Sequence, residues 1–241
     1  MKRLTTFVGG ALGWALGGPI GAVIGAVLGT LFSAEIVGKR KVSSKFKNSE
    51  TDFHASLLVL ASVVIKADGI VDSRELNFVR TQFVKWFGLK RTNDSFKVFS
   101  RLVENQPNVL EICNQVQQNM PYQGRLQIIA FLLDLSLSDG VLSQEERKQI
   151  VRISGYLGID RNEFAQLETI KFNKSKSPYD VLGIDQSSTE VEIKKMYRTL
   201  VKKYHPDAIV GMGDKVVSEA QNTFRKIQDA YETICKERVI K

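Results

Sequence analysis

The residues best suited to chemistry in this sequence are His205, Pro206 and Asp207, a tripeptide near its C-terminal end. An imidazole and a carboxylate can act in catalysis, but the tripeptide contains no serine or cysteine nucleophile for them to activate. A proline stiffens a turn, and a carboxylate accepts hydrogen bonds from a partner's arginine. Alone the tripeptide is weak evidence for any function, so its setting in the chain must decide.

A second group of candidate residues is acidic. Asp68, Asp72 and Glu75 offer oxygen ligands, but their spacing does not match a twelve-residue calcium loop. A similar segment occurs later in the chain, where Ser143 replaces one aspartate and precedes Glu146. Both Asp72 with Glu75 and Ser143 with Glu146 fit the pattern of a helix capping box. We therefore expect caps at the starts of two helices, with a metal site as the minor alternative.

The composition excludes several classes of protein. Two histidines and the separated Cys113 and Cys235 cannot form a zinc site of known spacing, so we expect reduced, partly buried thiols. The net charge of +8 suggests nucleic-acid or membrane-surface binding, but the positive residues lie in separate clusters without interleaved aromatics. We therefore predict no metal, no cofactor, no enzymatic activity of its own and no nucleic-acid partner.

The N-terminal part of the chain is apolar. Residues 4–34 contain no ionisable side chain, a run longer than the roughly 20 residues that cross a bilayer as a helix and too long for a signal peptide. Glycines recur at every fourth position, on one helix face that a second helix can approach closely. These glycines are Gly9, Gly13, Gly17, Gly21, Gly25 and Gly29. We predict a single membrane span that forms a homodimer, while Pro19 keeps a hairpin of two short passes open.

The charges that flank this segment predict its orientation. Lys2 and Arg3 precede it, and five lysine or arginine residues follow within a basic linker, residues 35–50. Positive residues remain on the cytoplasmic side, so the rest of the chain is predicted to be cytoplasmic. The linker either lies on anionic lipid headgroups or is a solvated connection.

Residues 51–172 are predicted to form an all-helical domain with an internal repeat. Helical periodicity persists, and no period-two alternation is long enough for a sheet. We expect helices at about 53–67, 72–87, 92–105, 107–119, 121–137, 143–157 and 160–171. In each half, an Asp-Gly turn follows an apolar helix. The pattern resembles the TerB-like helical domain, which implies a fold and an interaction module but no known activity.

Residues 173–241 place the His-Pro-Asp turn between two amphipathic helices. A short helix ending at Gly183 comes first, and Ser188 or Thr189 caps the next. Apolar residues at helical spacing predict that the two longer helices bury each other as a hairpin. The expected stripes are Ile193, Tyr197, Leu200, Val201 and Tyr204, and Val217, Ala220, Phe224, Ile227, Tyr231 and Ile234.

These features resemble the J-domain family. The resemblance implies docking to Hsp70 through His205, Pro206 and Asp207, together with Lys194, Arg198 and Lys202 on the preceding helix. The sequence departs from the family after Asp207, where residues 208–211 are apolar or glycine instead of basic or polar. It has no Gly/Phe-rich or Cys-rich zinc region, so client binding of the usual DnaJ kind is not expected.

The order of membrane segment, TerB-like domain and J domain resembles the DjlA-type membrane-anchored co-chaperones of bacteria. The resemblance implies a protein of the bacterial inner membrane that stimulates a cytoplasmic Hsp70 of the DnaK type and localises it to the membrane. The alternative is a membrane oligomer, scaffold or sensor with a degenerate J domain. The clients, and any ligand of the middle domain, are not indicated by the sequence.

Overall fold

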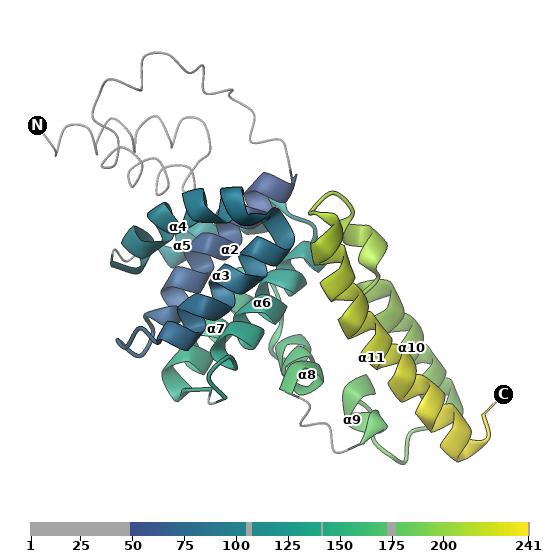
Figure 1. Cartoon of the computed structure of the whole chain (residues 1–241). Coiled ribbons are helices and arrows are strands. Elements are labelled where there is room, and N and C mark those ends of the chain that lie inside the picture. The colour runs from purple at the N-terminus through teal and green to yellow at the C-terminus, as the bar shows by residue number, and fades with distance from the viewer. Residues whose placement is uncertain (1–48, 105–107, 141, 173–176, 241) are drawn as a thin grey trace, which may run out of the picture.

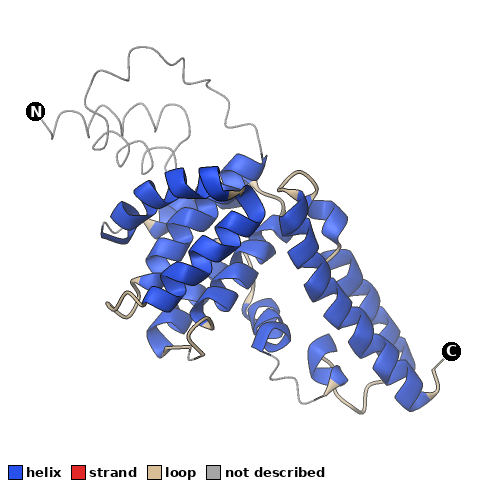
Figure 2. Cartoon of the chain, viewed as in Figure 1, coloured by secondary structure: helices blue, strands red, loops and turns tan. Residues whose placement is uncertain are grey.

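A computed structural model describes residues 49–104, 108–140, 142–172 and 177–240. Regular structure in these ranges is entirely helical, as Figure 2 shows, which confirms the predicted all-α fold. The elements, labelled in part in Figure 1, are α2 (Ser49–Ile65), α3 (Ser73–Phe87), α4 (Leu89–Glu104), α5 (Val109–Asn119), α6 (Tyr122–Ser136), α7 (Gln144–Tyr156), α8 (Arg161–Phe172), α9 (Pro178–Leu182), α10 (Glu190–Lys203), the 3₁₀ helix η1 (Pro206–Ile209) and α11 (Asp214–Arg238). The predicted boundaries lie within a few residues of these.

The predicted membrane segment and its six glycines fall outside the described residues, and so does the basic linker up to residue 48. The last two residues of the predicted linker, Ser49 and Glu50, begin helix α2. Within the described ranges, none of the helices combines the length and the apolar character that a membrane span requires.

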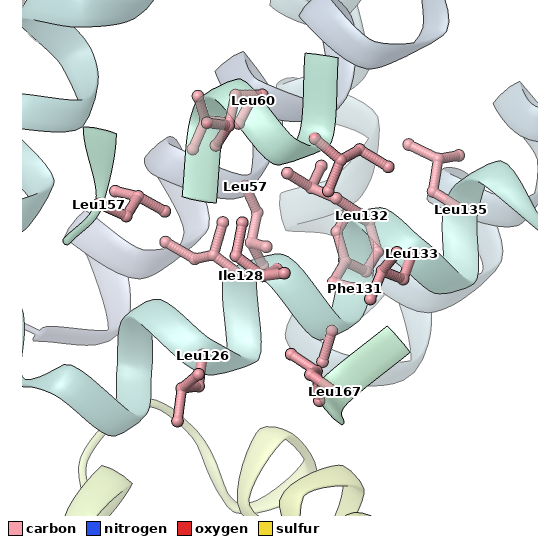
Figure 3. Close-up of a cluster of buried hydrophobic side chains, with 14 of the residues drawn as sticks. Leu57, Leu60, Leu126, Ile128, Phe131, Leu132, Leu133, Leu135, Leu157 and Leu167 are labelled. Carbon is pink, nitrogen blue, oxygen red and sulfur yellow. The ribbon is translucent and has the colours of Figure 1, made fainter. Parts of the chain in front are cut away.

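Helices α2 and α6 form the centre of a bundle that comprises α2–α8. Both are apolar on nearly every side, and a helix of this kind must be enclosed by others. Accordingly α2 packs on α4, α5, α6 and α7, and α6 also packs on α3 and α8. Figure 3 shows Leu57 and Leu60 of α2 gathered with Ile128 and Leu132 of α6 in one buried cluster. This rigid centre supports the surface to which the C-terminal helices attach.

Both predicted capping boxes are present in the bundle. Asp72 caps α3 with Glu75, and Ser143 caps α7 with Glu146. Gly69 precedes α3 in the left-handed region, at φ +84°, where a side chain would be strained. No group of three or more metal-ligating side chains occurs among the described residues.

The C-terminal helices form the predicted hairpin, with α9 packed across it (Figure 1). Three aromatic residues expected in its core are less deeply buried than predicted: Tyr197, Phe224 and Tyr231 are only partly covered. The fully enclosed positions of α11 repeat at three- and four-residue intervals, and include small or polar residues. They are Val216, Ala220, Thr223, Ile227, Ala230 and Ile234. The buried face of α11 therefore lies to one side of the row of residues that the sequence predicted, because small side chains fit where two helices approach closely.

Candidate functional site

The His-Pro-Asp turn begins a single 3₁₀ turn between the two long helices. Tyr204 ends α10, and Pro206 occupies the first turn of η1, where its fixed φ suits the backbone. His205 is the cap of η1, and its Nδ1 accepts a hydrogen bond from the Asp207 N–H at 3.3 Å. The histidine thus holds the turn in shape with its own side chain.

The two ionisable side chains of the turn differ in their surroundings. The Asp207 side chain is 83% exposed, while that of His205 is 44% exposed. The imidazole meets the ring of Phe224 edge-on, with centroids 5.6 Å apart. The Asp207 carboxylate lies 3.6 Å from His205 Nδ1 and is otherwise directed to solvent, where it can accept hydrogen bonds from another molecule.

A basic groove lies along the exposed side of α10. Lys194, Arg198 and Lys202 are spaced by four residues and so share one face of the helix. Lys195 and Thr199 line the same groove, together with the exposed Val191. Lys194 pairs with Glu190 one turn earlier, while Arg198 and Lys202 are exposed. The structure thus brings the three predicted basic residues together. It adds Lys195, which the sequence places on the same helix but which was not among the predicted binding residues.

Lys203 does not belong to this basic groove, although it follows Lys202. Its ammonium contacts the carboxylate of Glu163 on α8 and lies over the ring of Tyr122 on α6. The Tyr122 hydroxyl donates to the same carboxylate. Lys203 therefore attaches the hairpin to the bundle, a role that a helical pattern cannot reveal because its partners lie on other elements.

The turn itself is supported by the bundle. Tyr204, His205 and Ile209 line one small crevice with Gln123 and Leu126 of α6. Gly124, on the same helix, lies beneath Met212, which follows η1. The bundle thus contacts the back of the turn, whereas Asp207 and the basic groove face away from it.

Comparison with known families agrees with this arrangement. The model for the tellurite resistance protein TerB matches residues 54–169, and the model for the DnaJ domain matches residues 177–240. The model for the co-chaperone DjlA transmembrane domain matches residues 1–39. The chain is a DjlA-type protein.

Its relatives extend over most of its length. The co-chaperone protein DjlA of Shewanella oneidensis is 25% identical over 219 residues, which cover 82% of each chain. The co-chaperone protein DjlA of Coxiella burnetii is 27% identical over 81% of each chain. The chaperone protein DnaJ of Finegoldia magna is 48% identical over 59 residues, 24% of this chain and 14% of that one. No solved structure matches significantly.

These matches describe a membrane-associated J-domain co-chaperone, and its family is not one of enzymes. The transmembrane-domain match supports membrane anchoring by the N-terminal segment. The helices α2–α8 are the TerB-like domain, and α9–α11 with η1 are the J domain.

Proposed function

We propose that this protein docks on a DnaK-type Hsp70 in its ATP-bound state and accelerates ATP hydrolysis there. The observation that carries the proposal is the exposed carboxylate of Asp207 on a turn that Pro206 and His205 hold in shape. The relatives named as co-chaperones and the match to the DnaJ domain support the same conclusion.

The geometry suggests a division of labour within the J domain. The basic groove attracts an acidic surface from a distance and sets the orientation of the encounter. Asp207 then accepts charge-assisted hydrogen bonds from an arginine of the partner, and a preset turn forms them at little entropic cost. The hydrolytic chemistry remains that of the Hsp70, and the J domain selects the conformation in which it proceeds.

The membrane segment determines where this happens. We infer that residues 4–34 cross the bacterial inner membrane once, with the TerB-like and J domains in the cytoplasm. We further propose that the glycine face pairs two chains as a homodimer, and that the basic linker meets anionic lipid headgroups. Anchoring would concentrate Hsp70 activity at the membrane surface.

The test is single-turnover ATP hydrolysis by a DnaK-type Hsp70 with the full chain in lipid nanodiscs. Wild type is expected to stimulate hydrolysis, and His205→Gln or Asp207→Asn to lose at least about nine-tenths of the effect, roughly 1.4 kcal/mol. Asp229→Asn, an equally conservative change at an exposed position of α11, is the matched control and should stimulate normally.

If wild type fails to stimulate several Hsp70 proteins, or if both turn variants match it, the proposal is wrong. The membrane scaffold or sensor with a degenerate J domain would then be the better account. It predicts that a chain lacking residues 173–241 fully restores the phenotype of a deletion strain.

A further inference from the structure

A cleft lies where the TerB-like domain meets the J domain. Its volume is about 280 Å³, and its walls come from α3, α6, the residues that follow α6, α8 and the start of α11. One wall is aromatic: the ring of Phe131 lies 5.3 Å from that of Trp86 and 5.9 Å from that of Phe78, between centroids. Apolar walls with a few polar groups are typical of sites for small ligands or single side chains.

Polar atoms without partners are concentrated at this cleft. Gln82 Oε1, Trp86 Nε1 and Ser138 Oγ are buried and make no hydrogen bond, and all three residues line the cleft. They are three of the six such side-chain atoms in the described part of the chain. Each unpaired buried group costs about 1–3 kcal/mol, and an apolar residue of similar size would avoid the cost. A molecule bound in the cleft would supply the missing partners once these side chains turn toward it, because the three atoms are closed to solvent in the free protein.

The types of these atoms indicate what the molecule offers. The indole N–H of Trp86 needs an acceptor, the Gln82 carbonyl needs a donor, and the Ser138 hydroxyl serves as either. An amide provides an acceptor and a donor side by side. An extended peptide presents such an amide next to every side chain, and an apolar side chain would fill the space beside the rings.

The charged residues of the cleft are paired with one another. Asp134 pairs with Lys171 at 2.7 Å, and Glu219, on the J-domain wall, contacts Lys85. Because each carboxylate has an ammonium partner, the cleft selects its ligand by its apolar wall and its unpaired polar atoms and not by charge.

We propose that this cleft binds a short extended peptide segment of a client protein, with an apolar side chain on the aromatic wall and its main-chain amide on Gln82 and Trp86. The proposal rests on the co-chaperone function and adds to it a place for the client. Because Glu219 belongs to α11 and its carboxylate contacts Lys85 of α3, the segment would lie on the J domain that recruits the Hsp70.

The experiment is fluorescence anisotropy of a labelled eight-residue peptide, with a leucine–phenylalanine pair between lysines, titrated with the full chain in nanodiscs. Empty nanodiscs are the blank. Wild type should bind saturably, and Trp86→Phe and Gln82→Met should each weaken binding about five- to tenfold, because each loses one hydrogen bond. Gln118→Met, on the exposed surface of α5, is the matched control.

A thermal melt of the free proteins separates this role from a structural one. Trp86→Phe and Gln82→Met remove unpaired polar atoms, so each should keep or raise the Tm while it weakens peptide binding. If the two residues instead have a structural role, both substitutions should lower the Tm and leave peptide binding unchanged. The proposal is overturned by that result, or if wild type shows no saturable binding.

The two proposals can fail separately. Both cleft variants are expected to stimulate the Hsp70 ATPase as wild type does without peptide. If the chain binds the peptide but stimulates no Hsp70, the co-chaperone proposal is wrong and the proposal of a peptide site in the cleft is kept. If the chain stimulates Hsp70 but does not bind the peptide, only the proposal of the peptide site is wrong.

Discussion

At the scale of single residues, the side chains of Glu75 and Glu146 meet where the two halves of the repeat adjoin. Each is the third residue of its helix and closes a capping box, and each residue is only 6% exposed. Burial, and then the charge of Glu146, raise the pKa of Glu75 to about 8. Glu75 is therefore protonated at neutral pH and shares a hydrogen bond with Glu146.

This pair predicts a dependence of stability on pH. An unfolded chain releases the Glu75 proton near the ordinary glutamate pKa of 4.5, whereas the folded chain keeps it up to about pH 8. The free energy of unfolding should therefore fall as the pH rises from about 4.5 to about 8, because the unfolded state loses the proton first. Glu75→Gln should be the more stable protein at pH 8, by of order 2 kcal/mol. Urea denaturation at several pH values measures the difference.

Glu145→Gln is the matched control, since Glu145 is exposed and pairs with Lys148 three residues on. Its stability should follow wild type at every pH. Equal slopes for Glu75→Gln and wild type would mean that Glu75 is already ionised in the folded protein.

At the scale of elements, the sequence predicted every described α-helix from Ser49 to Arg238 and their all-α class, because apolar periodicity and caps are local properties. The capping boxes of α3 and α7 were likewise evident, since each needs only residues three apart. The face of α11 that is buried was not predicted correctly, because a threonine and an alanine, Thr223 and Ala230, do not mark a buried face as clearly as large apolar residues do. Helix packing decided which face was enclosed, and that depends on the partner.

The basic groove of α10 carries a prediction of its own. Arg198→Glu combined with Lys202→Glu should slow association with the ATP-bound Hsp70 about tenfold or more at low salt, because steering by the groove is reversed. The difference in association rate between wild type and this variant should become smaller at about 0.3 M salt, where charges are screened over shorter distances. Stopped-flow fluorescence of a labelled J-domain protein measures the rate.

Arg225→Glu with Lys236→Glu places the same charge change on exposed positions of α11. If that control slows association as much as the groove variant, the net charge and not the groove governs the encounter. The fold of both proteins is checked by circular dichroism.

At the scale of the whole molecule, the J domain contacts the TerB-like domain through the turn end of its hairpin and through α9, while the far ends of α10 and α11 project away from the bundle (Figure 1). Lys203 contacts Glu163, Lys85 contacts Glu219, and the Lys226 ammonium donates to a carbonyl of α8 at 3.0 Å. None of these contacts could be predicted, because no local pattern distinguishes a lysine that pairs across domains from a solvated one.

The close approach of Gly124 to Met212 makes this docking testable. The atoms nearest to a methyl group at residue 124 would be the flexible end of Met212 and the side chain of Met120, which can shift. Gly124→Leu demands more room than these side chains can yield, so the J domain should be displaced. Hydrogen exchange of η1 and the first turn of α11 should become about tenfold faster, while α2 and α6 remain protected.

Gly155→Leu is the matched control, since Gly155 lies on the exposed side of α7 and a Cβ atom there meets no atom within 4 Å. It should leave the hydrogen-exchange rate of η1 unchanged. The rate in Gly124→Ala should lie between those of Gly155→Leu and Gly124→Leu. If Gly124→Leu also leaves η1 unchanged, the contact with α6 does not restrain the turn, and the J domain presents Asp207 independently of the TerB-like domain. If η1 is released, the bundle sets the position from which the turn meets its Hsp70, and peptide bound in the cleft at the same junction would be held at a fixed place relative to it.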